Sequence, residues 1–340
     1  MARSWAWADI AVWGGMGAVM TVAAVAITAL AQDTRYFRIG TGPTESTYFS
    51  VGGGVASLIS NPPGSRDCER GGSCGVPGLI AVAQTTAGAL ATIDAIRGHQ
   101  LESGFTPADI AYWAFHGIGP FKDQGAVTEL RAIANLYPES MHIVVRRDSP
   151  ISSIGDLKGK NVSLGEKESG TLIEALIVLE AFGVAEAELR SEYLKPGVAS
   201  DRLSAGTLDA YFELAPYPAT TISDVAKATE IRLLPIKGTF AEKFGADYPF
   251  LTADTIPAGV YQGVPETETL SVATVWVVSS RIDDALVYGV TRALWHANSR
   301  RILDTLPRGR SIRQPKALDD LAIPLHAGAS LHYFESGMVR

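Results

Sequence analysis

Two short loops rich in glycine and hydroxyl residues have the composition of binding sites for a small anion. The first, residues 40–46, follows a predicted strand at residues 36–39 and leads into a helical pattern that begins near Tyr48. The second, residues 165–170, follows a predicted strand at residues 161–164 and leads into another helix. Free backbone N–H groups and the helix dipole attract anions to a helix N-terminus. Either loop alone is also common as an ordinary turn, so anion binding requires that both face one cleft.

Two other motifs begin like catalytic or cofactor-binding signatures. Residues 40–45, GTGPTE, start as a dinucleotide-binding fingerprint, but Glu45 stands where the third glycine belongs. Residues 71–75, GGSCG, match the G-x-S-x-G pattern around Ser73, but loop sequence flanks them in place of a strand and a helix. The six histidines form no metal-binding motif with cysteine or glutamate. The sequence therefore predicts neither a catalytic residue nor a metal site.

The N-terminal residues predict export. Residues 10–30 carry no charge, and Ala29-Leu30-Ala31 is a small-x-small cleavage pattern. Removal of residues 1–31 as a signal peptide is the main interpretation, and a retained membrane anchor is the alternative, because about 20 apolar residues can span a bilayer. The net charge of −7 argues against a nucleic-acid partner, because phosphate binding needs clustered Lys and Arg.

The two cysteines fit an oxidising compartment. Cys68 and Cys74 are six positions apart in a loop with three glycines. A disulfide that closes this loop is the leading interpretation. A metal site is disfavoured, because no histidine is near in sequence and two sulfurs do not complete a tetrahedral shell.

Strand-like and helical segments alternate along the chain, which predicts an α/β protein with mainly parallel sheets. The predicted strands are residues 36–39, 80–83, 141–145, 161–164, 210–212, 231–234 and 272–278, and the predicted helices include residues 88–97, 171–182 and 283–298. Two β-rich stretches, residues 141–148 and 271–280, have the pattern of strands that cross between lobes. One continuous doubly wound sheet is the alternative, and the pattern leaves both open.

From about residue 37 to residue 337 the chain resembles the TAXI-type substrate-binding proteins of TRAP transporters. The matching motifs are RIGTG with Tyr48-Phe49, the pair Cys68 and Cys74, AYWAFHGIGPF at 111–121, LYPESMHIVV at 136–145, DLKGKNVSLG at 156–165 with Ser169-Gly170-Thr171, Gly206-x-x-Asp209-Ala210-Tyr211-Phe212, residues 231–235 (IRLLP), Ile256-Pro257-x-Gly259-x-Tyr261, and IPLHAGASLHYFESG at 323–337. Each motif is short, and their shared order makes the resemblance specific.

The resemblance implies a periplasmic binding protein type II fold with two α/β lobes joined by a two-strand hinge. Lobe 1 then comprises residues 32–142 and 275–340, and lobe 2 comprises residues 143–274. It also implies a monomeric periplasmic receptor, without a cofactor, that captures a small organic anion such as glutamate or a dicarboxylate and delivers it to the membrane subunits of a TRAP transporter. The alternatives are an exported sensing domain with a membrane signalling partner, and a hydrolase that uses Ser73.

Carried over by position, the resemblance also implies a set of ligand contacts. They are Thr41, Gly42, Thr47, Tyr48, Ser169, Gly170 and Thr171 in the two loops, together with Glu139, Phe212 and Tyr261. Glu139 is expected to accept a ligand ammonium or to hydrogen-bond across the hinge, and Phe212 and Tyr261 are expected to form apolar walls. The chain departs from the family at residues 43–46, where glycines are usual. Glu45 would repel a carboxylate if it faced the cleft, which leaves a ligand other than glutamate open.

Overall fold

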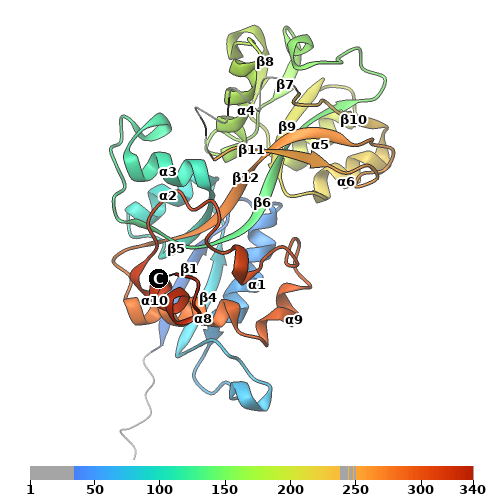
Figure 1. The fold of residues 1–340 in the computed structure, drawn as a ribbon. Coiled ribbons are helices and arrows are strands. Elements are labelled where there is room, and N and C mark those ends of the chain that lie inside the picture. Colours follow the sequence, from blue (N-terminus) through green and yellow to red (C-terminus); the bar gives the residue numbers. More distant parts are fainter. Residues whose placement is uncertain (1–33, 238–243, 245–247, 249, 340) are drawn as a thin grey trace, which may run out of the picture.

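The computed structural model describes residues 34–237, 244, 248 and 250–339. Figure 1 shows two lobes of strands and helices, with the long strands β6 (Leu130–Arg146) and β12 (Thr267–Ser279) running from one lobe into the other. The predicted signal peptide, residues 1–31, lies outside the described residues. Within those residues, no helix combines the length and the apolar character that a bilayer crossing needs.

Lobe 1 is built on β1 (Arg35–Gly40), which pairs in parallel with β4 (Leu79–Gln84) and β5 (Ser103–Pro107). Its helices are α1 (Thr47–Ile59), α2 (Ala89–Arg97), α3 (Ala108–His116), α8 (Asp284–Trp295), α9 (Ser299–Leu303) and α10 (Ala327–Glu335). The short strands β2 (Ser60–Asn61) and β3 (Val76–Pro77) form a separate parallel pair.

Lobe 2 repeats this plan. The strand β7 (Asn161–Ser163) pairs in parallel with β8 (Arg190–Glu192) and with β9 (Ala210–Ala215). Its other elements are α4 (Gly170–Ala181), α5 (Pro196–Ser204), α6 (Thr220–Ala228), β10 (Ile231–Leu233) and β11 (Thr252–Ile256). The chain also contains the 3-10 helices η1 (Cys68–Arg70), η2 (Gly119–Phe121), η3 (Ile154–Leu157), η4 (Glu186–Glu188) and η5 (Gln314–Lys316).

The strands β6 and β12 join the lobes in one hydrogen-bonded path. They pair antiparallel from Leu130 opposite Ser279 to Ser140 opposite Ser271, and the strand order of the sheet is β4-β1-β5-β12-β6-β9-β7-β8. Parallel pairs therefore occur within each lobe, and antiparallel pairs occur where the crossover strands join in. The predicted α/β class and the predicted pair of long crossover strands are both present.

Aromatic packing in lobe 1 holds Tyr48 at the lobe boundary. Phe37, Phe105 and Trp276 are fully buried, and the rings of Phe37 and Phe105 meet Trp276 edge-on with centroids 6.4 and 6.3 Å apart. Tyr48 in turn meets Phe105 edge-on at 5.9 Å. Edge-to-face pairs at these distances are favourable, so the core of lobe 1 fixes the orientation of the Tyr48 ring.

The two lobes touch each other, so the structure shows them closed. The Leu90 backbone N–H donates to the carbonyl oxygen of Glu168 at 3.2 Å, and Arg308 Nη1 donates to the carbonyl oxygen of Tyr217 at 2.5 Å. Gly88 lies so close to Glu168 that a Cβ atom on it would be 2.3 Å from the carbonyl oxygen, and its φ is +152°. Only glycine fits this approach of the two backbones.

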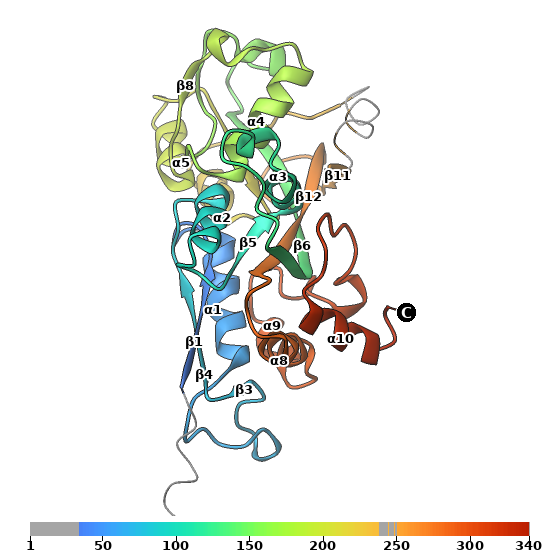
Figure 2. The same ribbon diagram turned by 90° about the vertical axis from the view of Figure 1, so that its left-hand side faces the viewer.

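The predicted disulfide between Cys68 and Cys74 is present. The loop that it closes lies at the end of lobe 1 remote from lobe 2 (Figure 2). The expectation that no histidine lies near the two cysteines is wrong, because in the folded chain His296 Nε2 lies 4.0 Å from Cys68 Sγ. With both sulfurs in the disulfide, neither cysteine offers the thiolate that a metal ion requires.

Candidate ligand-binding cleft

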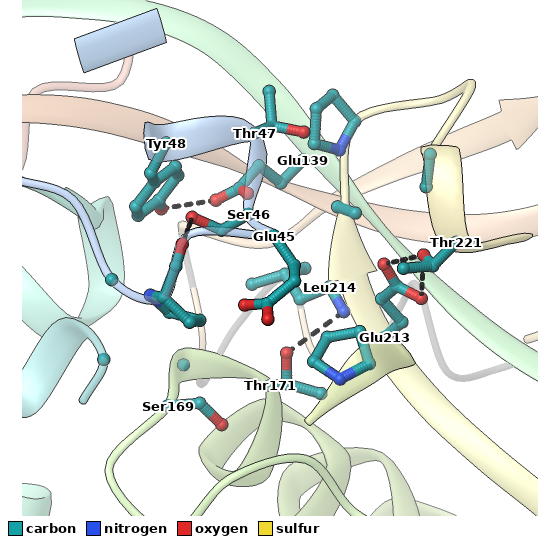
Figure 3. Close-up of a pocket in the computed structure, with 18 of the residues that line it drawn as sticks. Glu45, Ser46, Thr47, Tyr48, Glu139, Ser169, Thr171, Glu213, Leu214 and Thr221 are labelled. Carbon is teal, nitrogen blue, oxygen red and sulfur yellow. Dashed lines mark hydrogen bonds between the residues drawn. The ribbon is translucent and has the colours of Figure 1, made fainter. Parts of the chain in front are cut away.

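A cavity of about 140 Å³ lies between the two lobes. Its wall is formed by the N-terminal ends of α1 and α4, by Glu139 of β6, by the end of β9 and by the start of α6 (Figure 3). The predicted site residues that the structure brings to this wall are Gly42, Thr47, Tyr48, Glu139, Ser169, Gly170 and Thr171. The two loops singled out in the sequence therefore face one cavity, and the binding roles of these residues stay predictions.

The N-terminus of α1 presents two unused backbone donors to the cavity. Ser46 is the N-cap, and its Oγ accepts a hydrogen bond from the Phe49 N–H at 3.3 Å. The N–H groups of Thr47 and Tyr48 precede the first intrahelical hydrogen bond. Neither donates a hydrogen bond elsewhere in the described part of the chain. Both can therefore donate to an acceptor atom of a ligand.

The N-terminus of α4 repeats this arrangement from lobe 2. Ser169 is the N-cap, and its Oγ accepts from the Leu172 N–H at 3.2 Å. The N–H groups of Gly170 and Thr171 have no acceptor among the described residues. The Thr171 hydroxyl accepts from the Leu214 N–H at 3.2 Å, which ties α4 to β9. Each lobe thus contributes one serine-capped helix N-terminus with two free donors.

Glu139 is a buried carboxylate on the cavity wall. Glu139 is 4% exposed, and Tyr48 Oη donates a hydrogen bond to its Oε2 at 2.5 Å (Figure 3). Burial raises the pKa of Glu139 to about 8, although the hydrogen bond from Tyr48 opposes the rise. This bond joins α1 to the crossover strand β6 within lobe 1, and the predicted role of Glu139 toward a ligand or across the hinge stays a prediction.

Glu213 is a second buried carboxylate on the wall, and the sequence analysis missed it. It is 6% exposed, and the Thr221 hydroxyl lies 2.6 and 2.8 Å from its two carboxylate oxygens. Burial raises the pKa of Glu213 to about 7, although the Thr221 hydroxyl opposes the rise. One signal was available: Glu213 is the only charged residue in the strand-like run AYFELA.

Two further carboxylates line the cavity nearer to solvent. Glu45 is exposed, and in Figure 3 its side chain extends from the α1 loop toward Thr171. Glu166 comes from the corresponding loop of lobe 2. Burial raises the pKa of Glu166, Lys195 lowers it, and the negative charge of Glu45 raises it further. The two loops therefore bring like charges toward each other when the lobes are closed.

Three predicted contact residues do not line the cavity. Thr41 is buried beside α1, and its hydroxyl donates to the Gln84 carbonyl oxygen at 3.1 Å. Phe212 alternates with Glu213 along β9 and packs into the core instead. Tyr261 is 1% exposed, and its hydroxyl accepts from the Ala219 N–H at 2.9 Å. These three residues support the cavity wall from behind.

Tyr261 owes its buried position to His142. Burial lowers the pKa of His142 to about 4, so the ring is neutral at ordinary pH. Its Nδ1 lies 2.9 Å from the Ser140 carbonyl oxygen and therefore carries the proton. Nε2 is then the acceptor for the Tyr261 hydroxyl at 2.9 Å. This chain of bonds holds the start of α6, and with it Thr221, against the cavity.

Ser73 lies outside the cavity. Its hydroxyl contacts the Ser60 carbonyl oxygen and accepts from the Gly75 N–H at 3.0 Å. Within the described chain it has no hydrogen bond to a histidine or a carboxylate. Nothing in these contacts would activate it as a nucleophile.

A match to the NMT1-like family extends over residues 39–337. The chain belongs to the NMT1-like family. Among solved structures, PhnD1 from Prochlorococcus marinus (MIT 9301) in complex with methylphosphonate shares 12% sequence identity and a TM-score of 0.52, over 89% of this chain and 99% of its own. The alkanesulfonate-binding protein SsuA from Xanthomonas axonopodis pv. citri, bound to MOPS, shares 17% identity and a TM-score of 0.48, over 91% and 96%. The predicted periplasmic binding protein type II fold of this NMT1-like protein is confirmed. These matches do not test its narrower assignment to the TAXI proteins.

Proposed function

We propose that this NMT1-like protein is an exported solute-binding protein that closes its lobes over one small organic molecule. The observation that carries the proposal is the placement of two serine-capped helix N-termini, one from each lobe, on a single cavity. Four free N–H groups there offer hydrogen bonds to an acceptor group of the solute. A solute that bonds to both lobes at once stabilises the closed arrangement, and that closed state is what a membrane partner would recognise.

The partner that we propose is the pair of membrane subunits of a TRAP transporter. This rests on the ordered motifs of the sequence, from RIGTG to IPLHAGASLHYFESG, and places the mature protein in the periplasm as a monomer. A sensing role with a membrane signalling partner is the alternative. Genes for TRAP membrane subunits beside the gene for this chain would favour delivery, and genes for a membrane sensor would favour signalling.

Binding without catalysis is part of the same proposal. A hydrolase would need an activated nucleophile near the bound solute, and Ser73 lies outside the cavity. The sequence also predicts a small organic anion as the solute, and the free N–H groups support an oxygen acceptor at that position. We propose that the solute carries such an acceptor.

A thermal-shift screen of the exported protein tests this function. The protein is unfolded and refolded first, so that any trapped solute is removed. Amino acids, dicarboxylates, amines and other small organic compounds are then added. A solute at 100 times its Kd adds about 2.7 kcal/mol to the free energy of unfolding. A clear rise in melting temperature with one chemical class is the expected result.

A cavity-filling variant localises the effect. Thr47→Trp places an indole ring in the cavity and should abolish the shift, whereas Thr128→Trp, at an exposed loop position, should leave it intact. An unchanged shift in Thr47→Trp would contradict the proposed site. No shift with any class of compound would contradict the proposed function.

A further inference from the structure

The cavity wall has a one-sided charge distribution. Among the described residues that line it there are four glutamates, Glu45, Glu139, Glu166 and Glu213, and no Lys, Arg or His. None of the four forms an ion pair with another side chain in the described chain. A cavity built for an anion would present cations or only neutral donors, so this wall is poorly suited to a dicarboxylate.

The two innermost carboxylates are satisfied only by hydroxyl groups. The Tyr48 hydroxyl donates one hydrogen bond to Glu139, and the Thr221 hydroxyl donates one to Glu213. A hydroxyl donates a single hydrogen bond, so each carboxylate keeps acceptor capacity for another donor. A buried carboxylate without a positive partner is costly. A positively charged group in the cavity would remove this cost at both residues.

Two more carboxyl groups lie behind the wall. Asp109, on α3, and Glu174, on α4, are almost completely buried, and they follow the wall residues Pro107 and Gly170 along the chain. Asp109 Oδ2 and both carboxylate oxygens of Glu174 have no hydrogen-bond partner among the described residues. Burial raises the pKa of Glu174, and the charges of Asp109 and Glu139 raise it further. The whole group of acids therefore lacks a positive counterpart in the described chain.

The nearest cations are engaged elsewhere. Arg308 donates to the Tyr217 carbonyl oxygen and lies over the Tyr217 ring, with its Cζ 5.0 Å from the ring centroid. Lys195 is exposed at the start of α5 and acts on Glu166 through space. Neither residue belongs to the cavity wall. Apart from protonation of the carboxylates themselves, the solute is therefore the source of positive charge that could balance them.

We propose that the solute is an organic cation, an amine or amidinium compound, whose positive charge is balanced by Glu139 and Glu213. This inference rests on the proposed function and names the class of solute. The charged group donates to at least one of the two buried carboxylates, while the free N–H groups of α1 and α4 bind an acceptor atom on another part of the molecule. A cation between the lobes also offsets the repulsion between Glu45 and Glu166, so it favours closure.

Binding of a cation is then linked to release of protons. Because burial raises the pKa of Glu139 and of Glu213 to about 8 and about 7, both are largely protonated in the empty cavity below pH 7. A cation needs them ionised, so its Kd should fall as pH rises, by up to tenfold per unit for each group. The titratable groups that face this pair are Tyr48, Tyr137, Asp109 and Glu174 around Glu139, and Tyr211 and Tyr261 around Glu213.

Matched pairs of compounds test the proposal on the refolded, exported protein by titration calorimetry at pH 6.0 and pH 8.5. Each pair keeps the carbon chain and removes the nitrogen or replaces it by a hydroxyl: ethanolamine with ethylene glycol, putrescine with 1,4-butanediol, and glutamate with glutarate. The expected result is that only nitrogen compounds bind and that their Kd falls at least tenfold from pH 6.0 to pH 8.5. An amine remains protonated across this range.

Every other result overturns the proposal. Binding of a nitrogen-free acid with a Kd that rises between pH 6.0 and pH 8.5 would identify an anion site, and the proposed function would stand. The same holds if the thermal-shift screen finds a solute but no nitrogen compound binds in the calorimeter. Absence of binding by every compound in both experiments would overturn the cation and the proposed function together.

Discussion

The two lobes supply halves of the cleft that match in plan and differ in how the hydroxyl beside each buried glutamate is held. Each half has a serine-capped helix N-terminus, an acidic loop residue and a buried glutamate held by one hydroxyl. In lobe 1 that hydroxyl is Tyr48, which packs against the aromatic core through Phe105. In lobe 2 it is Thr221, which depends on the Tyr261–His142 hydrogen bond for its position. The carboxylate is therefore positioned by ring packing in lobe 1 and by a chain of buried hydrogen bonds in lobe 2.

Neutralising the two buried glutamates should give the largest effect. Glu139→Gln and Glu213→Gln keep the side-chain shape and remove the charge, and a hydrogen bond to a charged group contributes about 1.5–3 kcal/mol. We expect each variant to raise the Kd for a cationic solute about 10- to 100-fold, measured by titration calorimetry. The exposed Glu69→Gln is the matched control and should bind normally. Equal Kd values for all three variants would show that neither buried carboxylate contributes to binding of the solute.

The stability of the empty protein should depend on pH in the direction opposite to that of most proteins. Glu139 and Glu213 have pKa values raised to about 8 and about 7 by burial, so the folded state holds protons that the unfolded state loses near pH 4.5. Their contribution is therefore complete below pH 4.5 and is lost as the pH rises through 7 and 8. The loss is up to about 1.4 kcal/mol per pH unit for each group.

Urea unfolding of the refolded protein between pH 5 and pH 9 measures this dependence. In the double variant Glu139→Gln/Glu213→Gln the free energy of unfolding should fall less steeply with pH. The two single variants show how much of the fall comes from each glutamate. A wild-type protein whose stability does not fall between pH 5 and pH 9 would show that these groups ionise freely.

Closure should be sensitive to the one point where the two backbones meet. In Gly88→Ala the new Cβ would lie 2.3 Å from the Glu168 carbonyl oxygen, at a φ of +152° that alanine rarely adopts. We expect the lobes to stay apart, with a Kd about tenfold higher and a larger radius of gyration in X-ray scattering with saturating solute. A cost of about 1–3 kcal/mol is usual for a strained backbone position.

The control for this variant is Gly53→Ala on α1, where a Cβ has nothing within 4 Å. It should close and bind as the wild type does. If Gly88→Ala also compacts normally on adding solute, the contact between Gly88 and Glu168 does not form part of closure.

The smallest expected effect is at Ser73. Ser73→Ala removes a hydroxyl that bonds only to its own loop and to Ser60 in the described chain. The Kd should be unchanged, because this loop lies at the far end of lobe 1 (Figure 2). A variant that lost turnover of a bound solute would instead revive the hydrolase alternative.

Local patterns were sufficient to predict the elements that begin or end at special residues. The predicted strand at residues 161–164 is found as Asn161–Ser163, and the helix after Ser169 ends just before Gly183, whose φ is +67°. In contrast, β5 and α3 were missed. The sequence SGFTP of β5 contains glycine and proline, and the strand exists because β1 and β12 pair with it on both sides.

The site was predictable as far as local sequence positions a side chain. The two loops were found because a helix N-terminus is a local feature. Glu213 was missed because the charge of a residue in a strand does not reveal which face is open to a cavity. The family resemblance placed Tyr261 in the cleft, yet His142, which is 119 residues away in sequence, binds its hydroxyl in the core. Such long-range contacts are set by packing of the whole fold.

A crystal structure of the protein with its bound solute would test the central claim most directly. The solute is either the molecule that copurifies with the exported protein or the compound that gives the largest thermal shift. The account predicts a positively charged nitrogen within hydrogen-bond distance of Glu139 or Glu213, with an acceptor atom facing the N-termini of α1 and α4. A carboxylate, sulfonate or phosphonate group beside the two glutamates, or a solute bound outside this cavity, would contradict it.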